Sequence, residues 1–99
     1  MSRRVFKSHL SQTGITQLTF PPDTKILGVQ LQGAKPVIYY EIEENELTKG
    51  MSWRELELMT HTFMIILTGD EVPRNGEFLG TLMLGNGNFV VHVYEIGQE

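Results

Sequence analysis

The feature that most constrains the fold is the turn sequence Gly85-Asn86-Gly87. It separates two largely apolar segments of strand length, residues 78–84 and 88–96. Glycine and asparagine tolerate the positive φ angles of tight hairpin turns. The sequence from Glu77 to Glu95 therefore predicts a β-hairpin. Its second strand is apolar on both faces and carries one histidine, His92.

Five further segments have the alternation or the continuous apolar character of β-strands. They are residues 4–10, 15–20, 25–32, 37–43 and 62–68. Turn signals separate them, including Pro21-Pro22-Asp23, a hairpin loop of three to five residues at 33–36, and Pro73 with Asn75-Gly76. About seven short strands at this spacing predict an all-β fold, either a small antiparallel β-sandwich or a partly open barrel. The whole chain, 1–99, is expected to form one domain.

The alternation also predicts which residues share a face. Leu27, Val29 and Leu31 are expected on one side of their strand, and Ile38, Tyr40 and Ile42 on one side of the next. Gly80 is expected to be a hairpin glycine, like Gly85 and Gly87. Residues 52–59 stay ambiguous, because Ser52 and Glu55 match a helix capping box whereas 54–58 alternate like a strand.

Composition narrows the class of protein. The net charge of −4 gives no basic face for direct nucleic-acid binding, and Arg3, Arg4 and Lys7 are expected to be a solvated terminal segment. The absence of cysteine excludes disulfides and thiolate metal sites. The longest apolar run, 63–67, falls far short of the about 20 residues that span a bilayer, and no signal peptide is visible. We expect a cytosolic protein without membrane contact.

No catalytic constellation is apparent. His9, His61 and His92 lie on different expected strands without metal-ligand spacing, so neither a metal nor a cofactor is predicted. No nucleophile elbow or phosphate-binding glycine loop is present, which favours binding over enzymatic activity. His92, set among apolar neighbours, is either a core histidine bonded to a backbone carbonyl, or a ligand contact or pH-sensitive interface residue.

Large amphipathic side chains offer a binding surface without catalytic chemistry. Tyr39 and Tyr40 are adjacent on one strand, so one of them must face away from the core. Together with Trp53 and Tyr94, an outward tyrosine can form a stacking platform for a planar ligand or part of an interface.

The clearest family likeness lies in the segments KILGVQLQGAKPVIYYEIE, TFMIILTGDEVP and FLGTLMLGNGNFVVHVYE. In this order they resemble a family of short proteins of tailed bacteriophages, in which motifs such as ILSVQ-x-Q, LWALVD, GTGH-x-IP, IGT and VWHVFE follow a basic strand and a proline turn. The matching positions are 26–30 with Gln32, 38–43, Thr68-Gly69 with Val72-Pro73, Gly80-Thr81, and 90–95. The likeness extends from about Arg4 to Glu95.

The chain departs from the family pattern at several positions. Tyr39 and Val91 stand where the family often has tryptophan, Asp70 where it has histidine, and Leu67 where it has glycine. The segment 44–61 also looks long. If the aromatic and histidine positions line a site, this chain has altered it. The family has no established activity, so the resemblance implies a phage source and an all-β fold, but no mechanism. Together with the cytosolic expectation from composition, a phage source predicts a place in the host cytoplasm.

The leading functional hypothesis is a non-enzymatic phage accessory protein that sequesters a small host signalling molecule, such as a nucleotide, to counter host defence. It rests on the phage association and not on a recognised site. An acidic protein must bind an anion through local donors, such as backbone N–H groups at glycine turns or arginines. The candidate ligand contacts are Tyr39, Arg54, Thr68, Gly69, Arg74 and His92.

Two other hypotheses remain open. The acidic residues Glu41, Glu43, Glu44 and Glu46 could form a nucleic-acid-mimicking face that inhibits a host enzyme. Alternatively, the protein is a minor structural or assembly protein of the virion.

Self-association is predicted separately, from the last strand. Because Val91 and Val93 oppose Val90, Tyr94 and Ile96, both of its faces are apolar. Only one face can meet the core, so a loop or a second subunit must cover the other. We therefore expect a homo-oligomer.

Overall fold

A computed structural model describes residues 2–44 and 57–97 of the chain. They form seven antiparallel β-strands, and no helix occurs among them. Accordingly, no helix in these two ranges is long and apolar enough to cross a membrane. The strands are β1 (Ser2–His9), β2 (Gly14–Phe20), β3 (Lys25–Gln32), β4 (Lys35–Glu44), β5 (Met59–Leu67), β6 (Gly76–Leu84) and β7 (Phe89–Ile96).

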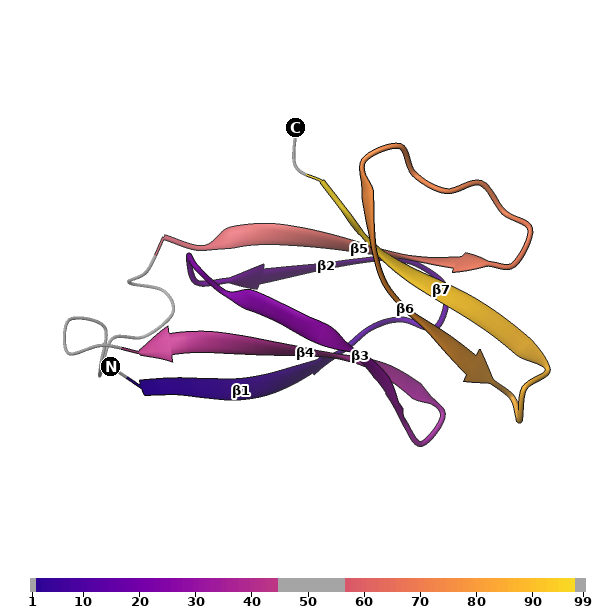
Figure 1. The fold of residues 1–99 in the computed structure, drawn as a ribbon, viewed down its shortest axis with the longest axis horizontal. Helices are drawn as coiled ribbons and strands as arrows, with labels where there is room; N and C mark the ends of the chain where they lie inside the picture. The colour runs from indigo at the N-terminus through magenta and orange to yellow at the C-terminus, as the bar shows by residue number, and fades with distance from the viewer. Residues whose placement is uncertain (1, 45–56, 98–99) are drawn as a thin grey trace.

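The strands form two sheets stacked as a β-sandwich (Figure 1). Sheet A has the order β1-β4-β3, and sheet B has the order β2-β5-β7-β6. The sheets are not closed into a barrel, which settles the alternative that the sequence left open.

All seven strands expected from the sequence are present, and their ends differ from the expected ones by at most three residues. The ambiguous segment is settled only at its end: residues 52–56 lie outside the described ranges, and Met59 begins β5.

The loop expected at 33–36 is shorter than predicted. Only Gly33 and Ala34 connect β3 to β4, and Pro36 pairs with Leu31 inside the sheet. Gly33 has a φ of 63°, which allows a two-residue turn. The carbonyl of Pro36 accepts a 2.9 Å hydrogen bond from the amide of Leu10. Leu10, which is not part of the β3–β4 hairpin, therefore helps to hold Pro36 in place.

The expected face of β3 is wrong at one residue. A register shift between Ile26 and Gly28 inserts Leu27 as a bulge, and this residue is exposed. Ile26 takes its place against the core, beside Val29 and Leu31. A bulge adds one residue to one strand only, so the period-two rule reverses its phase at this point.

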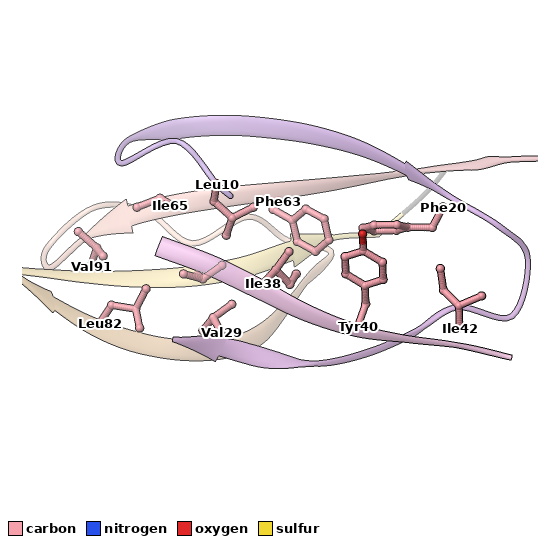
Figure 2. Packing of buried hydrophobic residues seen from close by; sticks show 11 residues of the cluster. Leu10, Phe20, Val29, Ile38, Tyr40, Ile42, Phe63, Ile65, Leu82 and Val91 are labelled. Carbon is pink, nitrogen blue, oxygen red and sulfur yellow. The ribbon is translucent and has the colours of Figure 1, made fainter. Parts of the chain in front are cut away.

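Buried apolar side chains from both sheets meet between them (Figure 2). As predicted, Ile38, Tyr40 and Ile42 of β4 share the core face. The ring of Phe20 lies 4.3 Å from that of Tyr40, measured between centroids, and 6.5 Å from that of Phe63. The core cluster comprises Leu10, Phe20, Val29, Ile38, Tyr40, Ile42, Phe63, Ile65, Leu82, Val91 and Val93.

Gly80 is not a hairpin glycine, contrary to the sequence prediction. It lies within β6, at a register shift between Phe78 and Gly80, where β6 approaches β3 of the other sheet. A Cβ atom at this position would lie only 2.6 Å from a methyl carbon of Val29. Glycine is therefore required here by the close approach of the two sheets, and not by turn geometry.

The connection from β5 to β6, residues 68–75, crosses sheet B. Both strands run antiparallel to β7, which lies between them, so they are parallel to each other. The chain leaves β5 beside Val91 and enters β6 beside Ile96, a return of about 17 Å along β7. Figure 1 shows this crossover arching on the side of β5 away from β4. It therefore passes over the outer face of sheet B.

Candidate ligand-binding site

The outer face of sheet B, defined as the side chains of β2, β5, β6 and β7 that point away from sheet A, contains no charged residue. The structure describes all four strands in full, and none of these positions holds Asp, Glu, Lys or Arg. The outward side chains are Ile15, Gln17, Thr19, Thr60, Thr62, Met64, Ile66, Phe78, Thr81, Met83, Val90, His92, Tyr94 and Ile96.

A polar cluster interrupts this face at its centre. His92 of β7 lies between two threonine hydroxyls: Thr68 Oγ1 is 3.0 Å from Nε2, and Thr81 Oγ1 is 3.0 Å from Nδ1. Thr81 pairs directly with His92 in the sheet, and Thr68 follows the end of β5. Three elements therefore supply the cluster: β6, β7 and the start of the crossover.

Both ring nitrogens of His92 face threonine hydroxyls. Thr68 Oγ1 also lies 3.3 Å from the carbonyl oxygen of Val90, and when the hydroxyl donates there it accepts from His92 Nε2–H. Nδ1 of the neutral ring is then the acceptor for the Thr81 hydroxyl. Because both ring nitrogens are engaged, proton transfer with a substrate would first require one threonine to move. The exposed hydroxyls keep acceptor capacity, which suits hydrogen bonding to a ligand.

Aromatic and apolar side chains form a row beside the polar cluster. The cross-strand pairs Ile15–Met64, Met64–Tyr94 and Tyr94–Phe78 are consecutive, so this row spans all four strands. The rings of Phe78 and Tyr94 meet edge to face at 5.5 Å between centroids. Residues two apart on a strand are separated by about 7 Å, which places Tyr94 one row from His92.

The crossover covers part of this face. Ile66 points outward from β5 but is only 3% exposed, and it is not a member of the core cluster between the sheets. A Cβ atom added at Gly76 would lie 3.1 Å from the Tyr94 ring and 3.3 Å from the Pro73 ring, so these two rings approach each other at the start of β6. The apolar outer face of the last strand is thus covered in part by the chain itself.

The candidate residues do not form a single site. The structure brings together Thr68, Gly69 and His92. Tyr39 lies half-buried on the outer face of sheet A, on the opposite side of the sandwich. Arg74 is exposed in the crossover, and Arg54 lies outside the described residues. The contact with Thr81 was missed, although the register of the hairpin contains it. Counting back from the turn, the pair Leu84–Phe89 leads without interruption to the pair Thr81–His92, and the bulge in β6 lies beyond Gly80.

His92 fits neither sequence interpretation completely. It is partly buried, as expected, but it is not a core residue, and its partners are side-chain hydroxyls instead of a backbone carbonyl. The interpretation as a ligand contact stays a prediction.

A second histidine is held by a carboxylate at the inner side of sheet B. His61 Nδ1 lies 2.8 Å from Glu95 Oε2, and both side chains are largely buried. The imidazole ring also packs against Phe20, at 5.1 Å, and Phe63, at 6.3 Å between centroids. The pair joins β5 to β7 at the edge of the aromatic core, which gives it a structural role in the sandwich.

The acidic residues of β4 are partly neutralised. Arg3 of β1 lies 3.4 Å from a carboxylate oxygen of Glu41 and 3.8 Å from one of Glu43. Lys25 of β3 is the register partner of Glu41 on its other side. Glu46 lies outside the described residues. The outer face of sheet A is therefore a mixed-charge surface around Glu41 and Glu43.

A family model matches the sequence over its full length. The family is described as a domain of unknown function, DUF7352, and its model matches residues 1–99. The chain belongs to the DUF7352 family. No curated protein and no solved structure is significantly similar to this DUF7352 chain. The function must therefore be argued from the geometry of its own residues.

Proposed function

We propose that this DUF7352 protein is a non-enzymatic accessory protein of a phage that binds a small planar molecule of the host, of the nucleotide class, and so counters host defence. The binding surface is the outer face of sheet B in an oligomer. The phage source and the host role rest on the family resemblance in the sequence. The proposed ligand rests on one observation: the Thr68–His92–Thr81 cluster lies beside the Phe78–Tyr94 ring pair.

This juxtaposition suits a nucleobase. Aromatic rings offer a stacking surface for a planar heterocycle, and adjacent hydroxyl and imidazole groups can hydrogen-bond to its edge. Phe78 and Thr81 are both exposed, so a ligand can reach ring and hydroxyl together. A threonine hydroxyl 3.0 Å from an imidazole is also the spacing of a nucleophile and its base. In this cluster, however, each ring nitrogen of His92 faces a hydroxyl and not an orienting carboxylate, which favours binding over catalysis.

Charge places a condition on the ligand. The crossover carries Arg74 on the same side of sheet B, but it also carries the exposed acidic residues Asp70 and Glu71. A strongly anionic ligand would meet no cationic patch there. We therefore expect recognition to depend on the base and its polar edge more than on the phosphates.

Isothermal titration calorimetry and thermal shift against a panel of mononucleotides and cyclic oligonucleotide messengers test the proposal. At least one compound should bind and raise the melting temperature. Thr81→Ala and Phe78→Ala should each weaken that binding about 10-fold, because each removes one hydrogen bond or one stacking face. Tyr39→Ala, on the opposite face of the sandwich, serves as the control and should bind like the wild type.

The proposal fails if no compound of the panel binds, or if the Thr81 and Phe78 variants bind as tightly as the wild type. The competing proposal of an acidic inhibitory face has less support, because Arg3 is paired with Glu41 and Glu43. Reversing the charge of these two glutamates should abolish capture of a host enzyme if that alternative is right.

A further inference from the structure

The two outer faces of the sandwich differ sharply in charge. The outward side of sheet A carries Arg3, Lys7, Lys25, Glu41 and Glu43, and hydrogen bonds such as the 2.9 Å contact from Lys7 Nζ to Gln32 Oε1 cross it. The outward side of sheet B has no Asp, Glu, Lys or Arg on any of its strands. Depletion of charge, with enrichment in aromatic residues and methionine, is the compositional mark of a protein interface.

The crossover leaves much of this uncharged face open. Whereas Ile66 beneath it is buried, Ile15 on β2 is 58% exposed, and Phe78 and Met83 on β6 are 55% and 64% exposed. These residues lie on the two edge strands of sheet B, on either side of β5 and β7. Val72 adds exposed apolar surface on the crossover itself. The chain's own loop is therefore too narrow to cover the face.

The area of the face is of the same order as the interface of a stable dimer. Four strands about 4.8 Å apart and about eight residues long, at about 3.3 Å per residue, give roughly 500 Å² of flat area. Side-chain relief and the crossover raise the accessible area above this value. A stable interface buries about 800 Å² on each partner, which is of the same order.

We infer that a second copy of this chain covers the outer face of sheet B, in a two-fold symmetric dimer. An uncharged surface would leave the charges of an acidic or basic partner buried without counterions, which is costly. The same face of a second copy is uncharged and equal in size, and a two-fold axis brings the two together. The charged residues of sheet A then stay in solvent on both copies.

The inference rests on the proposed function for the oligomeric state alone. Because it covers Phe78 with the second copy, it places the Thr68–His92–Thr81 cluster at the interface, so a ligand of this site would bind between the two copies. Its test needs no ligand, so failure of the dimer and failure of ligand binding can be told apart.

Light scattering coupled to gel filtration, on the full chain at 5–100 micromolar, measures the mass directly. The wild type should elute at twice its mass of 11.3 kDa. Met83→Glu and Phe78→Asp should raise the dissociation constant about 100-fold, because each buries an unpaired charge at the interface. Val5→Glu is the matched control, since Val5 is 60% exposed but lies on the outer face of sheet A.

Circular dichroism must show that each variant keeps the β-fold of the wild type. A clean monomer for the wild type at the highest concentration would overturn the inference. Dimers that persist in both sheet B variants would also overturn it, as would dissociation caused by Val5→Glu alone, because the interface would then lie on sheet A.

Discussion

At the scale of single residues, small features decide how the two sheets fit together. Gly80 does not have a positive φ angle, so residues other than glycine could adopt its backbone conformation. What excludes a side chain is the Val29 methyl group of the facing sheet, 2.6 Å from the position of a Cβ atom. The identity of this residue is therefore set by a neighbour about 50 positions away in the sequence.

Replacing Gly80 with alanine should destabilise the fold by about 1–3 kcal/mol, because β3 and β6 must separate to admit the methyl group. Urea denaturation followed by circular dichroism measures this change. The double variant Gly80→Ala with Val29→Ala should lose less free energy of unfolding than the sum of the losses in the two single variants. The reason is that Val29→Ala removes the methyl group that clashes with the Cβ atom added at position 80. Strict additivity of the two substitutions would show that the clash is not the cause.

At the scale of elements, the β6–β7 hairpin is held by its backbone conformation as well as by its strands. Gly85, Asn86 and Gly87 all have positive φ angles, of 58°, 58° and 90°. The amides of Gly87 and Asn88 donate to the carbonyls of Leu84 and Gly85, each at 3.1 Å. Asparagine is one of the few residues with a side chain that adopts this region at low cost, so the turn sequence and the turn geometry agree.

Substitution of Asn86 tests this agreement. Asn86→Val should cost roughly 1–2 kcal/mol, because a β-branched residue is strained at a φ of 58°. Asn86→Gly should be nearly neutral, since glycine adopts the same conformation freely. Thermal unfolding of the two variants beside the wild type measures the difference. Equal melting temperatures for the valine and glycine variants would mean that the turn relaxes to another conformation.

At the scale of the whole molecule, residues 2–44 and 57–97 of the sandwich share one thin core. Eleven buried side chains form the cluster between the sheets, and the uncharged outer face of sheet B is covered only in part. A domain of about 100 residues buries a limited share of its surface and is marginally stable by itself. Association through the open apolar face would add buried area that the monomer lacks.

The melting temperature should accordingly depend on protein concentration. Mass action stabilises a dimer that binds only in the folded state, so a 100-fold increase in concentration should raise the transition by several degrees. Differential scanning fluorimetry or calorimetry over this range provides the measurement. Met83→Glu should show a concentration-independent transition, and a wild type without any concentration dependence would contradict the expectation.

The strand content, the hairpin at Gly85–Gly87 and the core face of β4 could be predicted from the amino-acid sequence, because they follow from local φ preferences and from the two-residue period of a strand. Local rules failed where one residue was inserted, because the bulges at Leu27 and near Gly80 reversed the two-residue period.

Three features became visible only in the folded molecule. They are the sheet that each strand joins, the pairing of Arg3 with Glu41 and Glu43, and the uncharged outer face of sheet B with residues 68–75 crossing part of it. Strand order and the path of a crossover depend on contacts between segments that are distant in the sequence. These contacts contribute free energy only once the chain has folded. Alternation along one strand cannot encode them.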